Sequence, residues 1–305
     1  MSEPHPDAPV SVAFQTVLYQ TNHAALQRTL EALDNSARVG KRDLFCARFE
    51  VLLGDASPVP VLTDKHLNEL RARFEHLDRL EYQYFAENTG TSRGHNSLAQ
   101  MSDTDFQILA NPDVVVDALA IWRMVAVFND AAVGMVEAKQ LPVEHPKDYD
   151  RITGFTSWAS GAFSMIRRAV FEEVGGYDAQ SFFMYCDDVD LSWRVRETGR
   201  QIVFHPAAVV FHDKSLTVDG KWKPTSAEHY YSAQAALLLR HKWSRDDLVD
   251  RVLAIYDKSE TVEHRQAAEE FRRRRAAGEL VPQRDPDHRV GQFIDYTYAR
   301  HRYTL

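Results

Sequence analysis

The chain of 305 residues has only two cysteines, Cys46 and Cys186, and no long uncharged apolar run. Two isolated cysteines cannot form a disulfide framework, so we expect a reducing compartment. The longest apolar stretch, 114–128, is interrupted by Asp117 and Arg123, and it falls short of the roughly 18 uncharged residues that a spanning helix needs. The first ten residues lack the features of a secretory signal. We therefore expect a cytoplasmic protein that at most touches the inner face of the plasma membrane.

Positive charge is also scarce, with 36 Lys and Arg residues against 44 Asp and Glu residues and a net charge of −8. This balance argues against a general nucleic-acid partner, because such binding depends on neutralising phosphates. Hydrophobic residues make up 44% of the chain, which excludes disorder as its main state. A chain of this length forms a sizeable core, and we expect one large α/β domain with an appended segment.

Apolar runs and helical spacing alternate along the first 130 residues. The runs predict four strands: the first begins at Ser11, the second ends at Leu53, the third begins at Leu80 and the fourth ends before Asn111. Helices are expected from His23, over 64–80 and from near Val114. After residue 131 the pattern predicts two strands separated by a polar loop, followed by a short helix that two glycines end. A further helix ends near Gly199, and a last strand leads toward His212. Alternating strands and helices imply parallel pairing in an open, layered sheet.

Polar residues follow the predicted strands. Asp55, Asn88, Asp113, Asp188 and His212 all lie at or just beyond strand ends. In open α/β sheets, ligands bind at the carboxyl ends of the strands. These residues are therefore the candidates for a functional site.

The sequence Asn111-Pro112-Asp113 ends an apolar strand with a free carboxylate. Hard divalent cations bind oxygen ligands of this kind and can carry a diphosphate on their open side. Alternatively, Asp113 caps a helix that begins at Val114, which is the commoner role of such an aspartate. His212 is a potential metal ligand, although a single histidine is more often an ordinary surface or core residue.

The segment 185–191 places Asp187, Asp188 and Asp190 within four residues, just before a predicted helix. Close carboxylates raise one another's pKa, which suits a general base. A solvated acidic turn stabilised by the helix dipole explains the pattern equally well. We expect Asp190 to cap the helix, which leaves Asp188 available for chemistry.

A glycine-bearing loop, 88–96, follows the third strand and is rich in hydrogen-bond donors. Its main-chain amides and Arg93 could bind phosphate oxygens. The loop has neither a GK[ST] nor a GxGxxG pattern. A plain turn is the alternative interpretation.

Taken together, these segments resemble the inverting family 2 glycosyltransferases of the GT-A fold, especially the bacterial rhamnosyltransferase-like and galactofuranosyltransferase-like members. The resemblance covers about residues 10–245. The matching segments occur in the order of the family: VSVAFQTVLYQTN, LLGDAS, ENTGTSRGHN, ILANPDVVV, WASGAF, FFMYCDDVDLSWRVRETG and VVFHDKS.

The resemblance implies a role for each matching residue. Asp55 would contact the nucleobase and Asn111 the ribose side of the donor. Asp113 and His212 would bind a divalent metal, Mn²⁺ or Mg²⁺, and Asp188 would act as general base.

Further residues complete the nucleotide-sugar site that the resemblance implies. Tyr19, Asn88 and Arg93 join Asp55, Asn111 and Asp113 around the donor, while Trp158, Gly161 and Asp187 lie on the acceptor or donor-sugar side. The sequence departs from the family pattern at three positions. The usual Glu-Asp pair is Asp187-Asp188, the usual Tyr-Asn is Tyr19-Gln20, and Arg93 replaces a commonly small residue.

The implied reaction is the metal-dependent transfer of a hexose from dTDP-rhamnose or a UDP-sugar to a hydroxyl of a bacterial glycan, free or lipid-linked. Processive members carry Gln-x-x-Arg-Trp and membrane helices, whereas this chain has RHKWS at residue 240, so one sugar is expected per encounter. A catalytically silent nucleotide-sugar-binding or assembly subunit of the same fold is the alternative.

The resemblance also sets the expected domain boundaries. We expect a tail at 1–9, a GT-A domain at 10–215 and a helical extension at 216–305. Within the domain, the nucleotide-binding half ends at 115 and the acceptor half spans 116–215.

Residues 229–243 predict a helix packed on the domain, or alternatively an interfacial helix assisted by the arginines of 272–275. Because Glu269, Glu270 and Glu279 flank these arginines, a solvated helix face is more plausible than a nucleic-acid patch. The aromatic tail from Gln292 could pack on another subunit.

Overall fold

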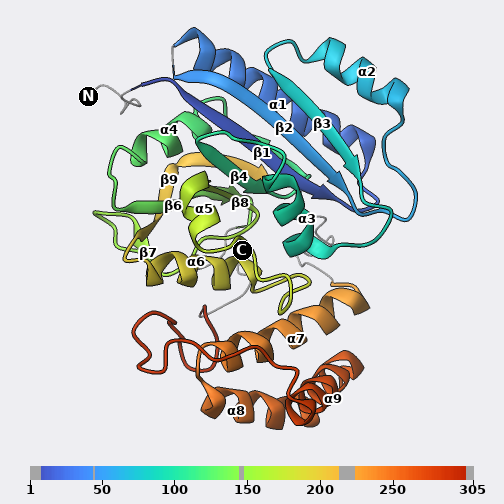
Figure 1. Ribbon diagram of the computed structural model, residues 1–305, viewed down its shortest axis with the longest axis vertical. Coiled ribbons are helices and arrows are strands. Elements are labelled where there is room, and N and C mark those ends of the chain that lie inside the picture. The colour runs from blue at the N-terminus through green and yellow to red at the C-terminus, as the bar shows by residue number, and fades with distance from the viewer. Residues whose placement is uncertain (1–7, 44, 144–147, 213–223, 300–305) are drawn as a thin grey trace.

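The structure is a computed structural model that describes residues 8–43, 45–143, 148–212 and 224–299. A nine-stranded sheet lies between two layers of helices, and three further helices pack together beside it (Figure 1). The helices α1, α2 and α4 cover one face of the sheet, whereas α3, α5 and α6 cover the other. The α/β class with a carboxyl-terminal helical group is thereby confirmed.

The first half of the domain alternates strands and helices as predicted, except that helix α3 was expected to be a loop. Its elements are β1 (Val10–Leu18), α1 (His23–Arg42), β2 (Cys46–Asp55), α2 (Asp64–Arg73), β3 (Arg79–Tyr84), α3 (Gly90–Ala99) and β4 (Phe106–Ala110). The four strands are parallel in the order β3-β2-β1-β4. Helix α2 ends earlier than the predicted residue 80, because Phe74 leaves the helix and is buried in the core.

The second half mixes strand directions. Its elements are β5 (Val114–Val116), α4 (Ala120–Val127), β6 (Val133–Leu141), β7 (Phe155–Thr156), β8 (Phe163–Arg167), α5 (Arg168–Glu173), α6 (Asp187–Glu197) and β9 (Gln201–His212). The antiparallel strand β8 joins β4 to β6, and β6 is parallel to β9. Six of the nine strands therefore run in one direction, namely β1, β2, β3, β4, β6 and β9. The central sheet is mostly parallel, as predicted.

The expected helix near Val114 is wrong. Val114 begins the short strand β5, whose residues pair antiparallel with the end of β9 so that Val114 lies opposite His212. Three consecutive β-branched valines favour this extended conformation. Asp113 consequently precedes a strand and caps no helix, and α4 begins only at Ala120.

The helical extension contains α7 (Ser226–Lys242), α8 (Asp246–Asp257) and α9 (Val262–Ala277), followed by a coil through residue 299. Leu237, Leu238 and Leu239 are buried in a second core, together with Trp193 of α6 and Phe271 of α9. The packed helix is therefore confirmed, and the three leucines face the core. Among the described helices, none combines the length and apolarity required to cross a membrane.

The four consecutive arginines of α9, residues 272–275, are paired with carboxylates. Arg272 contacts Asp257, and Arg273 contacts both Glu270 and Glu279. The other two arginines contact Glu270, Asp246 and Asp250. This is the charge-paired helix face that the sequence indicated.

A buried carboxylate joins α6 to α7. Asp190 Oδ2 accepts a hydrogen bond from Arg194 Nε (2.8 Å), and Oδ1 accepts one from Trp243 Nε1 (3.1 Å) and lies 2.7 Å from Lys242 Nζ. Lys242 Nζ also contacts Asp178 Oδ2 at 2.7 Å. The expected capping role of Asp190 is wrong, because the N-cap of α6 is Cys186 and Asp190 faces the neighbouring helix.

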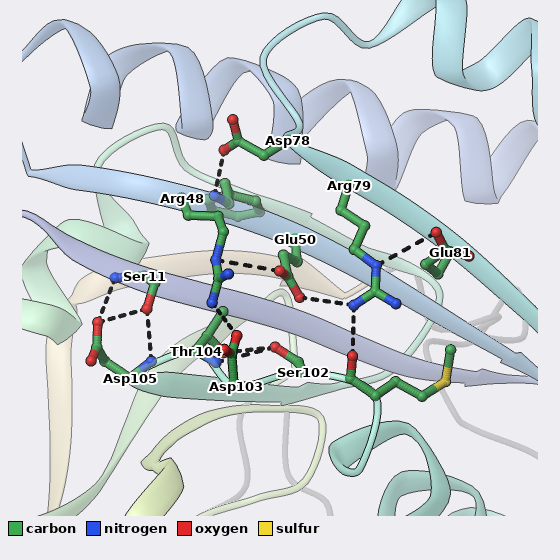
Figure 2. Close-up of polar contacts among 12 residues, drawn as sticks. Ser11, Arg48, Glu50, Asp78, Arg79, Glu81, Ser102, Asp103, Thr104 and Asp105 are labelled. Carbon is green, nitrogen blue, oxygen red and sulfur yellow. Dashed lines mark hydrogen bonds and ion pairs between the residues drawn. The ribbon is translucent and has the colours of Figure 1, made fainter.

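A second ion-pair network lies at the amino-terminal ends of the strands (Figure 2). Glu50 of β2 is buried between Arg48 and Arg79, at distances of 3.3 Å and 3.5 Å. Nearby, Asp105 Oδ2 accepts hydrogen bonds from the amide and hydroxyl of Ser11. These contacts fix the starts of β1, β2, β3 and β4 at the sheet edge opposite their carboxyl ends.

Replacing Asp190, the buried carboxylate between α6 and α7, should strongly destabilise the protein. We expect Asp190→Asn to lower the free energy of unfolding by about 3–5 kcal/mol, because the buried Arg194 would lose its carboxylate partner and Lys242 would keep only Asp178. Denaturant unfolding followed by circular dichroism measures this change. The matched control is Asp247→Asn, which removes an exposed pair with Arg245 and should cost less than about 1 kcal/mol. Equal effects of the two substitutions would contradict the role given to Asp190.

Candidate functional site

Six strands end at one edge of the sheet because they run in the same direction. Asp55 is the last residue of β2, lies beside Leu18 of β1 and pairs with Tyr84 of β3. Asn111 directly follows β4, and His212 is the last residue of β9. The sequence-predicted residues from separate segments therefore meet at the carboxyl edge of the sheet.

Asn111, Asp113 and His212 form one cluster at this edge. His212 Nε2 lies 3.2 Å from Asp113 Oδ1 and 3.2 Å from Asn111 Nδ2. The other ring nitrogen, Nδ1, lies 3.4 Å from Oε1 of the buried Gln140. When Nδ1 carries the proton and donates to Gln140, Nε2 presents its lone pair toward Asp113.

This cluster has the chemistry of a divalent cation site. In that tautomer Nε2 accepts a hydrogen bond from the Asn111 side-chain amide and faces the Asp113 carboxylate, so a bound cation would replace the Asn111 amide as the partner of Nε2. In the described part of the chain, no group of three or more His, Cys, Asp or Glu residues is arranged to hold a metal. Mg²⁺-type sites commonly use one or two protein ligands and complete their coordination with phosphates and water. Asp113 and His212 therefore fit such a cation as a pair.

Asp55 organises the loop that follows β2. Its side chain is fully buried, Oδ1 accepts a hydrogen bond from the Ser57 amide (2.9 Å), and Oδ2 accepts one from the Val61 amide (2.6 Å). The Tyr82 hydroxyl also donates to Oδ2, and burial together with this bond raises the pKa of Tyr82. Asp55 thus shapes the chain around it, and its contact with a nucleobase stays a prediction.

Within the expected phosphate-binding loop at 88–96, residues 90–96 instead form the first part of helix α3. Gly90 has a positive φ of 63°, and a Cβ atom there would lie 2.2 Å from the carbonyl oxygen of Phe183. The Thr91 amide donates to that same carbonyl (2.9 Å). Asn88 Oδ1 accepts from the Gly90 amide, and the exposed Arg93 pairs with Glu87 at 2.8 Å. The start of α3 is therefore used for packing against the segment before α6.

Asp187 is buried where α3 meets α6. Its Oδ2 accepts hydrogen bonds from the hydroxyls of Thr91 (2.6 Å) and Ser92 (3.1 Å). Burial and the neighbouring charge of Asp188 raise the pKa of Asp187 to about 6. The sequence analysis did not single out the two hydroxyls, although they lie within the matched segment 87–96.

Asp188 is half-buried and held by backbone amides. Its Oδ2 accepts from the Gly161 amide (2.9 Å) and its Oδ1 from the Val189 amide (2.8 Å). The preceding residues, Tyr185 and Cys186, both have positive φ angles, 67° and 55°. Such conformations cost free energy for residues with side chains, and they cluster at functional sites. This turn directs both carboxylates toward the start of α3 and the Gly161 segment.

The remaining predicted residues occupy different environments. Tyr19, just after β1, is 49% exposed at the carboxyl edge. Gly161 is close to Asp188, since a Cβ atom on Gly161 would lie 3.4 Å from that of Asp188. Trp158 is only 2% exposed, and its ring contacts Tyr298 edge to face at 5.2 Å. The indole of Trp158 therefore faces the carboxyl-terminal coil. The sequence analysis missed Gln140. It could have been noticed as a polar residue within a predicted apolar strand.

Comparisons with known proteins agree with this geometry. Residues 149–235 match the family described as "Glycosyltransferase like family 2". An N-acetylglucosaminyl-diphospho-decaprenol L-rhamnosyltransferase of Mycobacterium tuberculosis is 37% identical over 92 residues, which are 30% of each chain. Rhamnosyltransferase WbbL of Escherichia coli is 26% identical over 141 residues, covering 36% of this chain and 53% of the relative. The matched segments thus span 30% and 53% of the lengths of these two relatives.

Two solved structures share the fold. The crystal structure of GalNAc-T7 with UDP, GalNAc and Mn²⁺ has a TM-score of 0.63 at 14% identity, covering 90% of this chain and 60% of that one. The mannosyltransferase PcManGT of Pyrobaculum calidifontis with GDP-Man and Mn²⁺ has a TM-score of 0.58 at 14% identity, covering 93% and 79%.

These likenesses establish the GT-A fold for this chain. The segment matched by the family model also contains Trp158, Gly161 and the acidic pair of α6. Residues 149–235 are therefore similar to the family 2 glycosyltransferases, the family that the motifs of the chain resemble.

The raised pKa of Asp187 predicts a specific pH dependence of stability. The folded state holds the proton of Asp187 up to a pH of about 6, whereas the unfolded state releases it near pH 4. The contribution of Asp187 to the free energy of unfolding is therefore fully present below pH 4. This contribution, about 1–3 kcal/mol, is lost as the pH rises to 6. We expect Asp187→Asn to lose less stability than the wild type between pH 4 and pH 6.5 in urea unfolding. Asp64→Asn, at an exposed helix end, is the control, and a slope in Asp187→Asn that equals the wild-type slope would refute the assignment.

Proposed function

We propose that this chain is an inverting, metal-dependent, non-processive glycosyltransferase that transfers a sugar from a nucleoside-diphosphate sugar to a hydroxyl of a glycan acceptor. One observation carries the proposal. At the carboxyl edge of a GT-A sheet, the segment 161–162 links the cluster of Asn111, Asp113 and His212 to the acidic start of α6: the Asn111 backbone amide donates to the Ala162 carbonyl (3.1 Å), and the Gly161 amide donates to Asp188 (2.9 Å). Two rhamnosyltransferase relatives favour dTDP-rhamnose as the donor, and the UDP-bound neighbour supports a UDP-sugar as the alternative.

Asp188 is the proposed general base. In a single displacement, its carboxylate takes the proton of the acceptor hydroxyl while the oxygen forms a bond to the anomeric carbon. The bond from that carbon to the diphosphate breaks, and the leaving group departs with the electron pair, so the configuration inverts. The amides of Gly161 and Val189 each occupy one lone pair of the carboxylate, which fixes its orientation and leaves other lone pairs for the proton.

Asp113 Oδ1 and His212 Nε2 would hold the divalent cation. When bound, Mn²⁺ or Mg²⁺ supplies positive charge that stabilises the departing diphosphate. Gln140 would keep the His212 ring in the tautomer that presents Nε2. The Mn²⁺ named with both neighbouring structures supports this use.

The donor and acceptor sides follow from the placement of the other residues. Tyr19, Asn88, Arg93 and Asn111 are proposed to surround the nucleotide-sugar, with Asp55 shaping the loop on the nucleobase side. Asp187, Gly161 and Trp158 are proposed to line the opposite side. The name of the mycobacterial relative includes a lipid-linked sugar diphosphate, which supports a lipid-linked glycan acceptor reached from the cytoplasmic face.

Removing the proposed base should separate binding from turnover. We expect Asp188→Asn to retain the thermal shift with its nucleotide-sugar and to lose transfer or donor hydrolysis by about 10²–10⁴-fold. A panel of nucleotide-sugars with Mn²⁺ or Mg²⁺ first identifies the donor of the wild type. Full turnover in Asp188→Asn would sink the base assignment. A wild type that binds a nucleotide-sugar but never turns it over would instead be the silent subunit.

Removing the metal ligands should weaken cation binding directly. We expect Asp113→Ala and His212→Ala each to reduce Mn²⁺ affinity at least tenfold in calorimetric titrations with the donor nucleotide present. His205→Ala, on the same strand as His212 but away from its end, is the control and should bind Mn²⁺ like the wild type. Unchanged Mn²⁺ affinity in both ligand variants would rule out this pair as the metal site.

A further inference from the structure

A groove lies between the loop 148–158 and the carboxyl-terminal coil 288–299. Three adjoining cavities form it, with volumes of about 420, 340 and 300 Å³. The first two share Asp148, Ser157 and Gln292 in their walls. The second and third share Phe155, Thr156 and Arg196. The hollow is therefore continuous along these two segments.

We propose that this groove binds sugar units of the acceptor glycan. The inference rests on the proposed function, because it assigns an acceptor subsite to the same catalytic centre. The largest cavity combines planar polar side chains with aromatic rings, namely Asp148, Arg245, His288, Gln292, Trp158, Phe293 and Tyr298. Sugar hydroxyls need donors and acceptors of this kind, and the apolar faces of sugar rings pack on aromatic surfaces.

A short length of chain separates the near end of the groove from the proposed base, and the far end of the groove lies at the amino-terminal start of β9. Trp158 lines the largest cavity and precedes Gly161, whose amide binds Asp188, by three residues. Three residues span at most about 11 Å. Helix α6 then leads away from Asp188 to Arg196, which borders the other two cavities and lies about 12 Å further along the helix. The groove can therefore hold glycan units that extend away from the reacting hydroxyl.

The charges of the groove favour a hydroxyl-rich ligand over a strongly anionic one. Arg245 makes a bidentate pair with Asp247, Arg200 pairs with Glu173, and Arg289 pairs with Asp287. Among the described residues no ion pair involves Arg196, whose Nη1 donates to the Val290 carbonyl at 2.7 Å. One half-buried arginine is a suitable donor for sugar hydroxyls, but it is too little charge to hold a nucleic acid or a membrane surface.

The coil wall of the groove is fixed before any ligand arrives. Asp285 accepts hydrogen bonds from the amides of Arg289, Val290 and Gly291. Arg240 of α7 donates to the Tyr296 carbonyl, with Nε at 2.9 Å. A wall held in this way loses little conformational entropy when a ligand binds.

The test uses the whole chain with UDP and Mn²⁺ at saturation, so that the donor side is filled. The probes are L-rhamnose, N-acetyl-D-glucosamine, D-galactose and D-mannose, observed by saturation-transfer difference NMR. We expect at least one sugar to give a signal with the wild type. Gln292→Trp should reduce that signal at least fivefold by filling the largest cavity, and Gln292→Ala should weaken it.

The matched controls are Gln283→Ala and Gln283→Trp, on an exposed part of the same coil that lies outside the groove. Both controls should keep the wild-type sugar signal. No signal from any sugar, or equal signals in the wild type and Gln292→Trp, would overturn the groove assignment. If the wild type still shows a thermal shift with its nucleotide-sugar in that case, only the groove fails; if that shift is also missing, the proposed function fails.

Discussion

The buried carboxylate of Asp190 is the contact on which the rest of the catalytic half depends. It contacts Arg194, Lys242 and Trp243 inside the second core, where an unpaired charge would be costly. Helix α6 can therefore reach its final position only when α7 is packed against it. Since Asp187 and Asp188 begin that helix, the helical extension determines where the acidic pair lies. The extension thus shares a buried core with α6 and packs as part of the same structural unit.

Close backbone packing completes the site around this helix. Gly90 allows the carbonyl of Phe183 to approach α3, and the backbone amide of Gly161 donates a hydrogen bond to Asp188. The left-handed conformations of Tyr185 and Cys186 turn the chain sharply before α6. Their cost in free energy is offset by the buried contacts on both sides of the turn, which include those of Asp187 with Thr91 and Ser92. Packing on three separate segments therefore fixes the direction of the two carboxylates.

Much of the fold was predictable because apolar runs and helical spacing are local signals. The strands β1, β2, β3 and β4 and the class of the domain follow from them. The exceptions depend on partners distant in the sequence. The strand at Val114 forms because it pairs with the end of β9, and Asp190 faces inward because α7 supplies Lys242. The 88–96 segment forms a helix because it packs on Phe183, which no local pattern indicates. For the site, strand ends and family-like motifs located the residues, but the partners of His212 and Asp187 required the three-dimensional structure.

Because the chain is synthesised from its amino terminus, the carboxyl-terminal coil is the last of the described segments to become available for packing. Residues 285–299 follow in the sequence every helix that they contact, including Arg196 of α6 and Arg240 of α7. During translation the coil consequently docks onto a surface that has already formed, and until then Trp193 and Trp243 lack the cover of Phe293 and Gly291. A nascent chain with its sheet complete still exposes part of its second core to water. The interval before docking is when this protein is most prone to aggregate or to bind a chaperone.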